Sequence, residues 1–146
     1  MMTLPAEDAA QLLTLLPLIN KTVVSLIDLK GLGYTRTQLY ILIALARYGN
    51  LTMTQVCGYI SSSKEQATRA VAPLVDSGLV ERYVDPANRT RIHICLTPEG
   101  VDFLDRRKRQ FCAALQQHME QTVTAQDRAE LRTATATLIR ILSKFS

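Results

Sequence analysis

The sequence lacks the residue patterns on which the common enzyme classes depend. It holds six glycines and two histidines, yet no glycine run could cradle a phosphate and no serine stands in a nucleophile elbow. The carboxylates and histidines form no cluster along the chain. Since catalysis needs several such groups in one place, we expect neither an enzymatic activity nor a cofactor.

Cysteine is scarce and irregularly spaced. Cys57, Cys95 and Cys112 include no Cys-x-x-Cys pair, so we expect no disulfide framework. His93 and His118 stand far apart, so we expect no metal site either. This usage suits a reducing compartment. Cys57 lies on an apolar stripe and is expected in the core, whereas the sequence leaves redox activity at Cys95 or Cys112 open.

Signals for export or membrane insertion do not stand out near the start of the chain. Residues 1–10 have no basic start of the kind that a secretory signal carries. An apolar run over residues 9–29 follows, but we expect its interruptions to leave less than the ~20 mostly apolar residues that span a bilayer. The interruptions are Pro17, Asn20, Lys21 and Asp28. We therefore expect a cytoplasmic protein with no membrane partner.

The composition suits a small globular protein. With 146 residues and 47% hydrophobic content, the chain can build one compact unit, or a lobe with a module for self-association. The formal net charge of +4 is modest. Residues 31–97 hold seven Lys or Arg against four Asp or Glu, a net of +3. Most of the basic excess therefore lies in the middle of the chain.

Two S/T-x-x-E/Q capping boxes mark two closely spaced helices in that basic region. Thr52 with Gln55 begins the first helix, and Ser63 with Gln66 begins the second. An apolar stripe at helical spacing follows each start. The stripes are Met53, Val56, Cys57 and Ile60 in the first helix and Ala67, Ala70, Val71 and Leu74 in the second. The order predicts a helix pair joined by a short turn.

The second helix has a polar face opposite its apolar stripe. Side chains such as Arg69 can bond to base edges in a groove, and small ones such as Thr68 permit close approach. An ordinary solvated helix face has the same composition, so this helix alone leaves both interpretations open. We also predict a bend at Pro73, because proline removes the N–H that would bond the carbonyl of Arg69.

A hairpin follows the second helix. The helix is predicted to end at Gly78, and residues 79–84 and 92–96 are predicted to be strands on either side of a polar loop. Arg89 and Arg91 have no helical i+4 partner that would explain them as surface ion pairs. We interpret the hairpin as a wing that reaches phosphates or a minor groove, and a merely soluble hairpin tip is the alternative.

Three phrases in and around the hairpin carry a family resemblance. They are Gly78-Leu79-Val80-Glu81-Arg82, Asp85-Pro86-Ala87-Asn88-Arg89 and Leu96-Thr97-Pro98-Glu99-Gly100. With them, residues 34–104, about half of the chain, resemble the MarR family of bacterial transcription regulators.

The resemblance implies a mainly α fold with a small β-hairpin wing. A winged helix-turn-helix lobe would stand between N- and C-terminal dimerisation helices. The implied parts are residues 1–33 for the N-terminal dimerisation helix, 34–97 for the DNA-binding lobe and 98–146 for the C-terminal dimerisation helices. The resemblance also implies a regulator, most often a repressor in this family, that binds a pseudo-palindromic double-stranded DNA operator as a homodimer.

The resemblance further implies which residues contact DNA. In the recognition helix they are Ser63, Lys64, Gln66, Thr68 and Arg69, and in the wing Asn88, Arg89 and Arg91. The family usually has Asp-Arg-Arg where this chain has Asn88, Arg89 and Thr90. One acidic and one basic group are therefore missing from the wing, and Arg91 is the residue that could compensate.

Many family members release DNA when a small aromatic compound binds between the dimerisation helices and the lobe. By resemblance, the candidates for such an effector pocket are Tyr34, Tyr40, Tyr48 and Phe111. Packing residues with solvated hydroxyl groups are an equally open interpretation of these rings.

The two ends of the chain favour a partner on their own evidence. Residues 9–29 are apolar on nearly every side of a helix. A long helix is expected from Pro98, and after a helix start at Thr124 another apolar stripe runs from Leu131 to Phe145. We expect an intertwined dimer, with packing inside a monomer as the alternative.

The densest positive patch runs from Arg106 to Arg109. Asp102 and Asp105 precede this run at i+4 spacing, so we expect a solvated helix face with ion pairs there, with weak phosphate contact as the alternative.

A different function stays open beside DNA binding. A winged-helix module could dock a protein through the outward face of the second helix. The salt dependence of binding discriminates between the two, because only phosphate neutralisation makes affinity fall steeply with salt.

Overall fold

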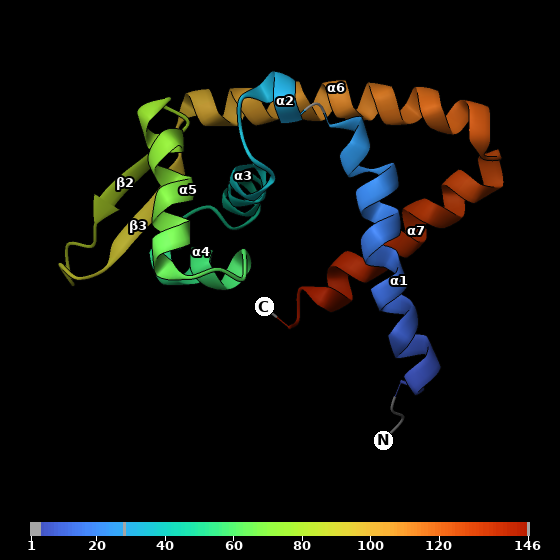
Figure 1. Cartoon of the computed structure of the whole chain (residues 1–146), viewed down its shortest axis with the longest axis horizontal. Coiled ribbons are helices and arrows are strands. Elements are labelled where there is room, and N and C mark those ends of the chain that lie inside the picture. Colours follow the sequence, from blue (N-terminus) through green and yellow to red (C-terminus); the bar gives the residue numbers. More distant parts are fainter. Residues whose placement is uncertain (1–3, 28, 146) are drawn as a thin grey trace.

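The chain folds into a winged lobe that one long helix connects to the C-terminal helix, whereas the N-terminal helix precedes the lobe in the chain (Figure 1). This computed structural model describes residues 4–27 and 29–145. Met1–Thr3 and Asp28, on which part of the export and membrane predictions depends, lie outside those ranges. In chain order the elements are α1 (Ala6–Thr22), the short 3-10 helix η1 (Val24–Leu26), α2 (Leu29–Leu32), α3 (Arg36–Tyr48), β1 (Leu51–Thr52), α4 (Met53–Tyr59), α5 (Lys64–Asp76), β2 (Val80–Val84), β3 (Ile92–Leu96), α6 (Pro98–Thr122) and α7 (Ala125–Leu142).

Side-chain hydrogen bonds cap the N-termini of several helices. The predicted starts at Thr52, Ser63 and Thr124 are confirmed, because each side chain accepts a hydrogen bond from the backbone N–H three residues later. Helix α3 begins in the same way, with Thr35 Oγ1 3.2 Å from the backbone N of Gln38. This capping box, Thr35 with Gln38, is not among the helix starts predicted from the sequence. Such a cap is worth about 1 kcal/mol to a helix.

The predicted hairpin is part of a three-stranded antiparallel sheet with the strand order β1-β3-β2. Tyr83 of β2 lies opposite His93 of β3, and Leu51 of β1 lies opposite Ile94 on the other side of β3. Both wing strands match the sequence prediction to within one residue. The sequence does not indicate β1, because two residues are too few to show the alternation that identifies a strand.

The core of the lobe lies between these helices and the sheet. Leu42 of α3, Val56 of α4, Val71 of α5 and Ile94 of β3 are nearly fully buried in one cluster. Cys57 packs half-buried against the same cluster, as its place on the apolar stripe predicts. The predicted apolar stripes of α4 and α5 therefore face inward. As a consequence, the polar face of α5 is turned to solvent.

Helix α6 is fixed to the lobe at the corner where α5 ends. Thr97 Oγ1 donates a hydrogen bond to Gly78 O at 2.5 Å, and Thr97 N donates to Leu79 O at 3.1 Å. A Cβ atom on Gly100 would lie 2.1 Å from Leu79 O. Only glycine permits this approach, so the corner sets the direction in which α6 leaves the lobe.

The terminal helices add little to the core. Neither α1 nor α7 contains a buried residue. On α1, Leu13 and Leu16 expose 69% and 66% of their surface. Ile139 and Leu142 of α7 are about half exposed, at 48% each. Both helices therefore present apolar surface that the described chain leaves uncovered.

The sequence-based argument that the N-terminal segment is too short and too interrupted to cross a membrane is wrong. Ala6–Leu26 is 21 residues long with a mean hydropathy of 1.4, which is enough by length and composition. Pro17 and Lys21 interrupt it less than expected, because α1 continues through both. One such helix near the N-terminus remains weak evidence for a membrane span, because core helices of soluble proteins and signal sequences pass the same test.

Candidate nucleic-acid interface

The outward face of α5 is polar and exposed. Ala67, Val71 and Leu74 bury the opposite side of the helix in the core, which confirms the predicted amphipathic pattern. The five predicted groove residues are all exposed: Ser63, Lys64, Gln66, Thr68 and Arg69. Their contact with DNA stays a prediction, but their exposure around the N-terminal half of α5 is compatible with it.

Three of these five side chains bond to their own helix. Ser63 Oγ accepts from Gln66 N at 3.2 Å, and Gln66 Oε1 accepts from Ser63 N at 3.3 Å. Thr68 Oγ1 donates to the carbonyl oxygen of Lys64 at 2.8 Å. These bonds hold the first turns of α5 in shape, so Ser63 and Gln66 serve the helix as caps before they can serve any ligand.

The two cations of this face are unpaired. Across residues 4–27 and 29–145, neither Lys64 nor Arg69 has a carboxylate oxygen within 4.0 Å. Lys64 is the first residue of α5, where the backbone N–H groups and the helix dipole also favour an anion. The face is thus equipped for phosphate, and Arg69 has the forked donor geometry that suits paired acceptors.

A buried glutamine supports α5 from behind. Gln38 of α3 is 7% exposed, and its Nε2 donates to the carbonyl oxygen of Ala70 at 3.2 Å. Pro73 lies inside α5, which continues to Asp76. The bend predicted at Pro73 remains a prediction. The role of Gln38 is not among the sequence predictions, although the Thr35-x-x-Gln38 pattern is visible in the sequence as a capping box.

The wing loop is closed by hydrogen bonds that converge on Asp85. The backbone N of Asp85 donates to Arg91 O at 2.9 Å, and Asn88 N donates to Asp85 O at 3.2 Å. The carboxylate accepts from Ala87 N at 2.8 Å through Oδ1 and from His93 Nε2 at 2.8 Å through Oδ2. The His93 bond and then the Ala87 bond hold the pKa of the Asp85 carboxyl below its usual value.

The three predicted wing contacts differ in role: one holds the shape of the loop, and the other two are exposed cations. Asn88 Oδ1 accepts from Thr90 N at 3.1 Å and from Thr90 Oγ1 at 2.6 Å. Thr90, which stands where the family usually has a basic residue, therefore helps to hold the loop. Arg89 and Arg91 are exposed, and among the residues that the structure describes neither has a carboxylate within 4.0 Å.

The histidine of the wing is stacked as well as bonded. The rings of His93 and Tyr83 lie 5.2 Å apart at an angle of 14°. The Tyr83 hydroxyl accepts a hydrogen bond from the side-chain amide of Asn50, just before β1. Tyr83 and His93 therefore connect the wing loop to the rest of the sheet.

The structure does not unite the aromatic residues suggested for an effector pocket. Tyr34 packs edge-on against Phe103 at 5.5 Å, and Tyr48 lies 5.0 Å from Tyr59. Burial, and after it a hydrogen bond with Tyr48, raises the pKa of Tyr59 to about 12. Tyr40 is exposed and Phe111 half-buried. Within the described chain no ring contact joins any two of the four candidates, whose role in ligand binding stays a prediction.

The ion pairs expected beside the basic run of α6 do not form. In the described chain, none of the residues 106–109 has an Asp or Glu oxygen within 4.0 Å. The guanidinium of Arg107 instead lies 5.3 Å from the centroid of the Phe103 ring and donates to Gln110 Oε1 at 3.0 Å. The i+4 carboxylates are too short and too solvated to hold these long side chains.

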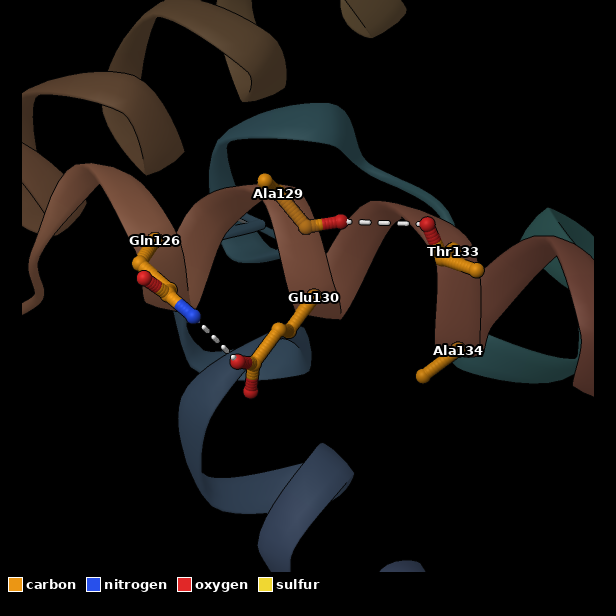
Figure 2. A pocket seen from close by; sticks show the side chains of 5 residues that line it. All are labelled: Gln126, Ala129, Glu130, Thr133 and Ala134. Atoms are coloured by element: carbon orange, nitrogen blue, oxygen red, sulfur yellow. Dashed lines mark hydrogen bonds between the residues drawn. The ribbon is translucent and has the colours of Figure 1, made fainter.

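An open hollow of about 580 Å³ lies along α7 (Figure 2). All of its lining residues come from that one helix: Gln126, Ala129, Glu130, Thr133 and Ala134. Gln126 and Thr133 bond within the helix, to Glu130 Oε1 at 3.1 Å and to the Ala129 carbonyl oxygen at 3.3 Å. Because the hollow is open and lies along a single helix, it suits the approach of another helix better than the enclosure of a small ligand.

Comparison with known proteins agrees with this architecture. The family model described as MarR family matches residues 32–89. No curated protein matches the sequence. Among solved structures, wild-type MarR from E. coli without ligand has a TM-score of 0.72 at 20% identity, covering 95% of this chain and 99% of its own.

Two further solved structures have similar folds. A mutant MarR from E. coli, complexed with operator DNA, has a TM-score of 0.65 at 21% identity and covers 94% of this chain and 99% of its own. AbsC, a MarR family transcriptional regulator from Streptomyces coelicolor, has a TM-score of 0.63 at 19% identity over 99% of both chains. Since the AbsC match covers nearly all of this chain, the apolar helix α1 belongs to the shared fold.

The helix pair α4 and α5, followed by the β2–β3 hairpin, makes this chain a winged helix-turn-helix protein. The MarR family model matches the sequence of the lobe, and the solved MarR structures share the fold of nearly the whole chain.

Proposed function

We propose that this protein is a transcription regulator that binds double-stranded DNA sequence-specifically as a homodimer. The observation that carries the proposal is the pair of unpaired cations, Lys64 and Arg69, on the exposed face of a helix whose other face is anchored in the core. The wing beside that helix adds Arg89 and Arg91, also without carboxylate partners in the described chain. The operator-bound structure of a MarR mutant with a similar fold supports the same use of the lobe.

On α5 the proposed roles differ among the side chains. Arg69 would read a base edge in the major groove, because its fork can bond two acceptors of one guanine. Lys64, at the start of the helix, would contact a phosphate, aided by the helix dipole. Ser63, Gln66 and Thr68 would make shorter-range contacts, and Gln66 would have to exchange its bond to Ser63 for one to DNA.

In the wing, Arg89 and Arg91 would bind phosphates or enter the minor groove. Asn88 is engaged with Thr90, so we propose that its main task is to shape the tip. Such contacts strengthen binding to every DNA sequence alike, so recognition of a particular operator sequence would depend on α5.

A homodimer would use the uncovered surfaces of the terminal helices. In our division of the chain, residues 1–33 and 98–146 supply that interface, and residues 34–97 bind DNA. The exposed leucines of α1 and the open hollow along α7 support the proposal, because both surfaces are exposed to solvent in a single chain. A two-fold axis would place the two α5 helices about 34 Å apart, one turn of DNA.

The finer functional assignments follow from the resemblance to the MarR family. We propose a cytoplasmic repressor that binds a pseudo-palindromic operator. A small aromatic effector would release it by binding between the dimerisation helices and the lobe. Tyr34, Tyr40, Tyr48 and Phe111 remain the candidate contacts, and their scatter within one chain requires that a pocket be completed by the second subunit or by a movement of the lobe.

The test is selection of bound fragments from random duplexes, followed by titration of the recovered sequence at several salt concentrations. A DNA regulator should recover a sequence with two half-sites, and its affinity should fall with a log–log slope of about −0.9 per phosphate neutralised. Failure to enrich any duplex at low salt would overturn the proposal. Salt-insensitive binding of a protein by the α5 face would favour the docking alternative.

A further inference from the structure

We propose that the Asp85–His93 contact is a side-chain latch that holds the wing loop in the conformation it presents to DNA. The inference rests on the proposed DNA-binding function for its consequence, but the latch itself is a property of the free protein. Its components are a carboxylate at the end of β2, an imidazole on β3 and the loop between them.

The geometry makes Asp85 the organising residue of the loop. One carboxylate oxygen takes the Ala87 amide, and the other takes His93 Nε2, each at 2.8 Å. Among the side-chain hydrogen bonds of the described chain, the bond to His93 is the one that ties the loop back to β3. Without it, the loop would keep its turn bonds but lose its side-chain anchor on the strand.

His93 is itself held in place. Tyr83 stacks on its ring, and the Tyr83 hydroxyl is bonded by Asn50. The side chains of His93 and Asp85 expose only 20% and 17% of their surfaces. The latch therefore joins a held imidazole to the wing loop. Arg89 and Arg91, the proposed wing contacts, lie between Asp85 and His93 in the chain.

Several charged and titratable groups surround His93. On the same face of the sheet lie Glu81 and Tyr83 of β2, with Arg91 and Cys95 flanking His93 on its own strand, and Asp85 in the loop. Thr52, its partner on β1, is uncharged. The Asp85 carboxylate lies 2.8 Å from His93 Nε2, and its pKa is held below its usual value.

A hydrogen bond to an ionised carboxylate is roughly twice as strong as one between neutral groups. The ionised Asp85 therefore gives the latch its strength, and the latch weakens when Asp85 protonates below its depressed pKa. Removing either partner should loosen the loop and lower the affinity for the operator.

The first test needs no DNA. Amide hydrogen exchange of Ala87 and Arg91 is compared at a single pH near 6 between the wild-type chain and His93→Gln, Asp85→Asn and His118→Gln variants. We expect exchange about three-fold faster in the first two variants, and unchanged exchange in His118→Gln, which removes the other histidine, exposed on α6. Equal protection of both amides in wild type and His93→Gln would overturn the latch.

The second test measures affinity for a duplex that the protein has selected from random sequence. His93→Gln should bind this duplex about three-fold more weakly than wild type, whereas His118→Gln should bind it as tightly as wild type. A His93→Gln variant with wild-type affinity would overturn the proposal. If wild type selects no duplex, the DNA-binding function fails, and the exchange experiment still decides whether the latch exists.

Discussion

Gln38 joins the start of α3 to the middle of α5. Its Oε1 accepts from the backbone N of Thr35 at 2.8 Å, and its Nε2 donates to the Ala70 carbonyl oxygen at 3.2 Å. Pro73 lies one turn after Ala70 and denies the Arg69 carbonyl its usual helical donor. The turn that contains Arg69 is thus weakened by proline and supported from behind by a side chain of another helix.

This support predicts a stability difference between two similar substitutions. Gln38→Glu keeps an acceptor for the α3 cap but sets an oxygen against the Ala70 carbonyl, so it should lower the free energy of unfolding by about 1–3 kcal/mol. Gln55→Glu, in the exposed capping box of α4, is the matched control and should change it by less than about 0.5 kcal/mol. Urea unfolding measures both. Equal stability of the two variants would refute the role given to the Ala70 bond.

The corner between α5 and α6 predicts a steric effect. Gly100→Ala places a Cβ 2.1 Å from the Leu79 carbonyl oxygen, so we expect a loss of about 1–3 kcal/mol of stability from overpacking. Gly58→Ala, in α4, meets nothing within 4 Å and should be neutral or stabilising by up to about 1 kcal/mol. Thermal unfolding of the two variants tests this, and a Gly100→Ala protein as stable as wild type would show that the corner can relax.

The two arginines of the interface predict different kinds of loss. Arg69→Ala should cost about 1–3 kcal/mol on the selected duplex and relax the preference at one base pair. Arg89→Ala should weaken binding to all duplexes alike and reduce the salt slope by about one phosphate. Competition titrations with single-base variants distinguish the two outcomes. Unchanged operator affinity in Arg69→Ala would remove that residue from the proposed site.

The exposed face of α1 predicts the state of assembly. Wild type should sediment at about twice its chain mass of 16.3 kDa. Leu13→Glu places a charge on the exposed apolar surface of α1 and should shift the equilibrium to monomer, because a buried unpaired carboxylate is costly. Gln11→Glu, an exposed polar position on the same helix, should leave the dimer intact. A wild-type monomer at micromolar concentration would exclude the proposed interface.

Much of the lobe could be predicted because its signals are local. The capping boxes at Thr52 and Ser63, and the alternation over β3, each depend on residues within a few positions of one another. His93 lies in a strand that the sequence predicts, but its hydrogen-bond partner, Asp85, lies in the loop, and no periodic pattern relates the two. Ion pairs beside Arg106 were predicted from spacing alone and did not form, because spacing does not fix where long, solvated side chains point.

By itself the sequence determined the order of helices and strands, their starts and the side of each that is apolar, because caps and periodicity act over one or two turns of chain. Only the tertiary structure decided which distant groups meet: Gln38 with Ala70, Gly100 with Leu79, and Asp85 with His93. Such meetings depend on how whole elements pack, and packing sums many weak contacts that no single stretch of sequence contains.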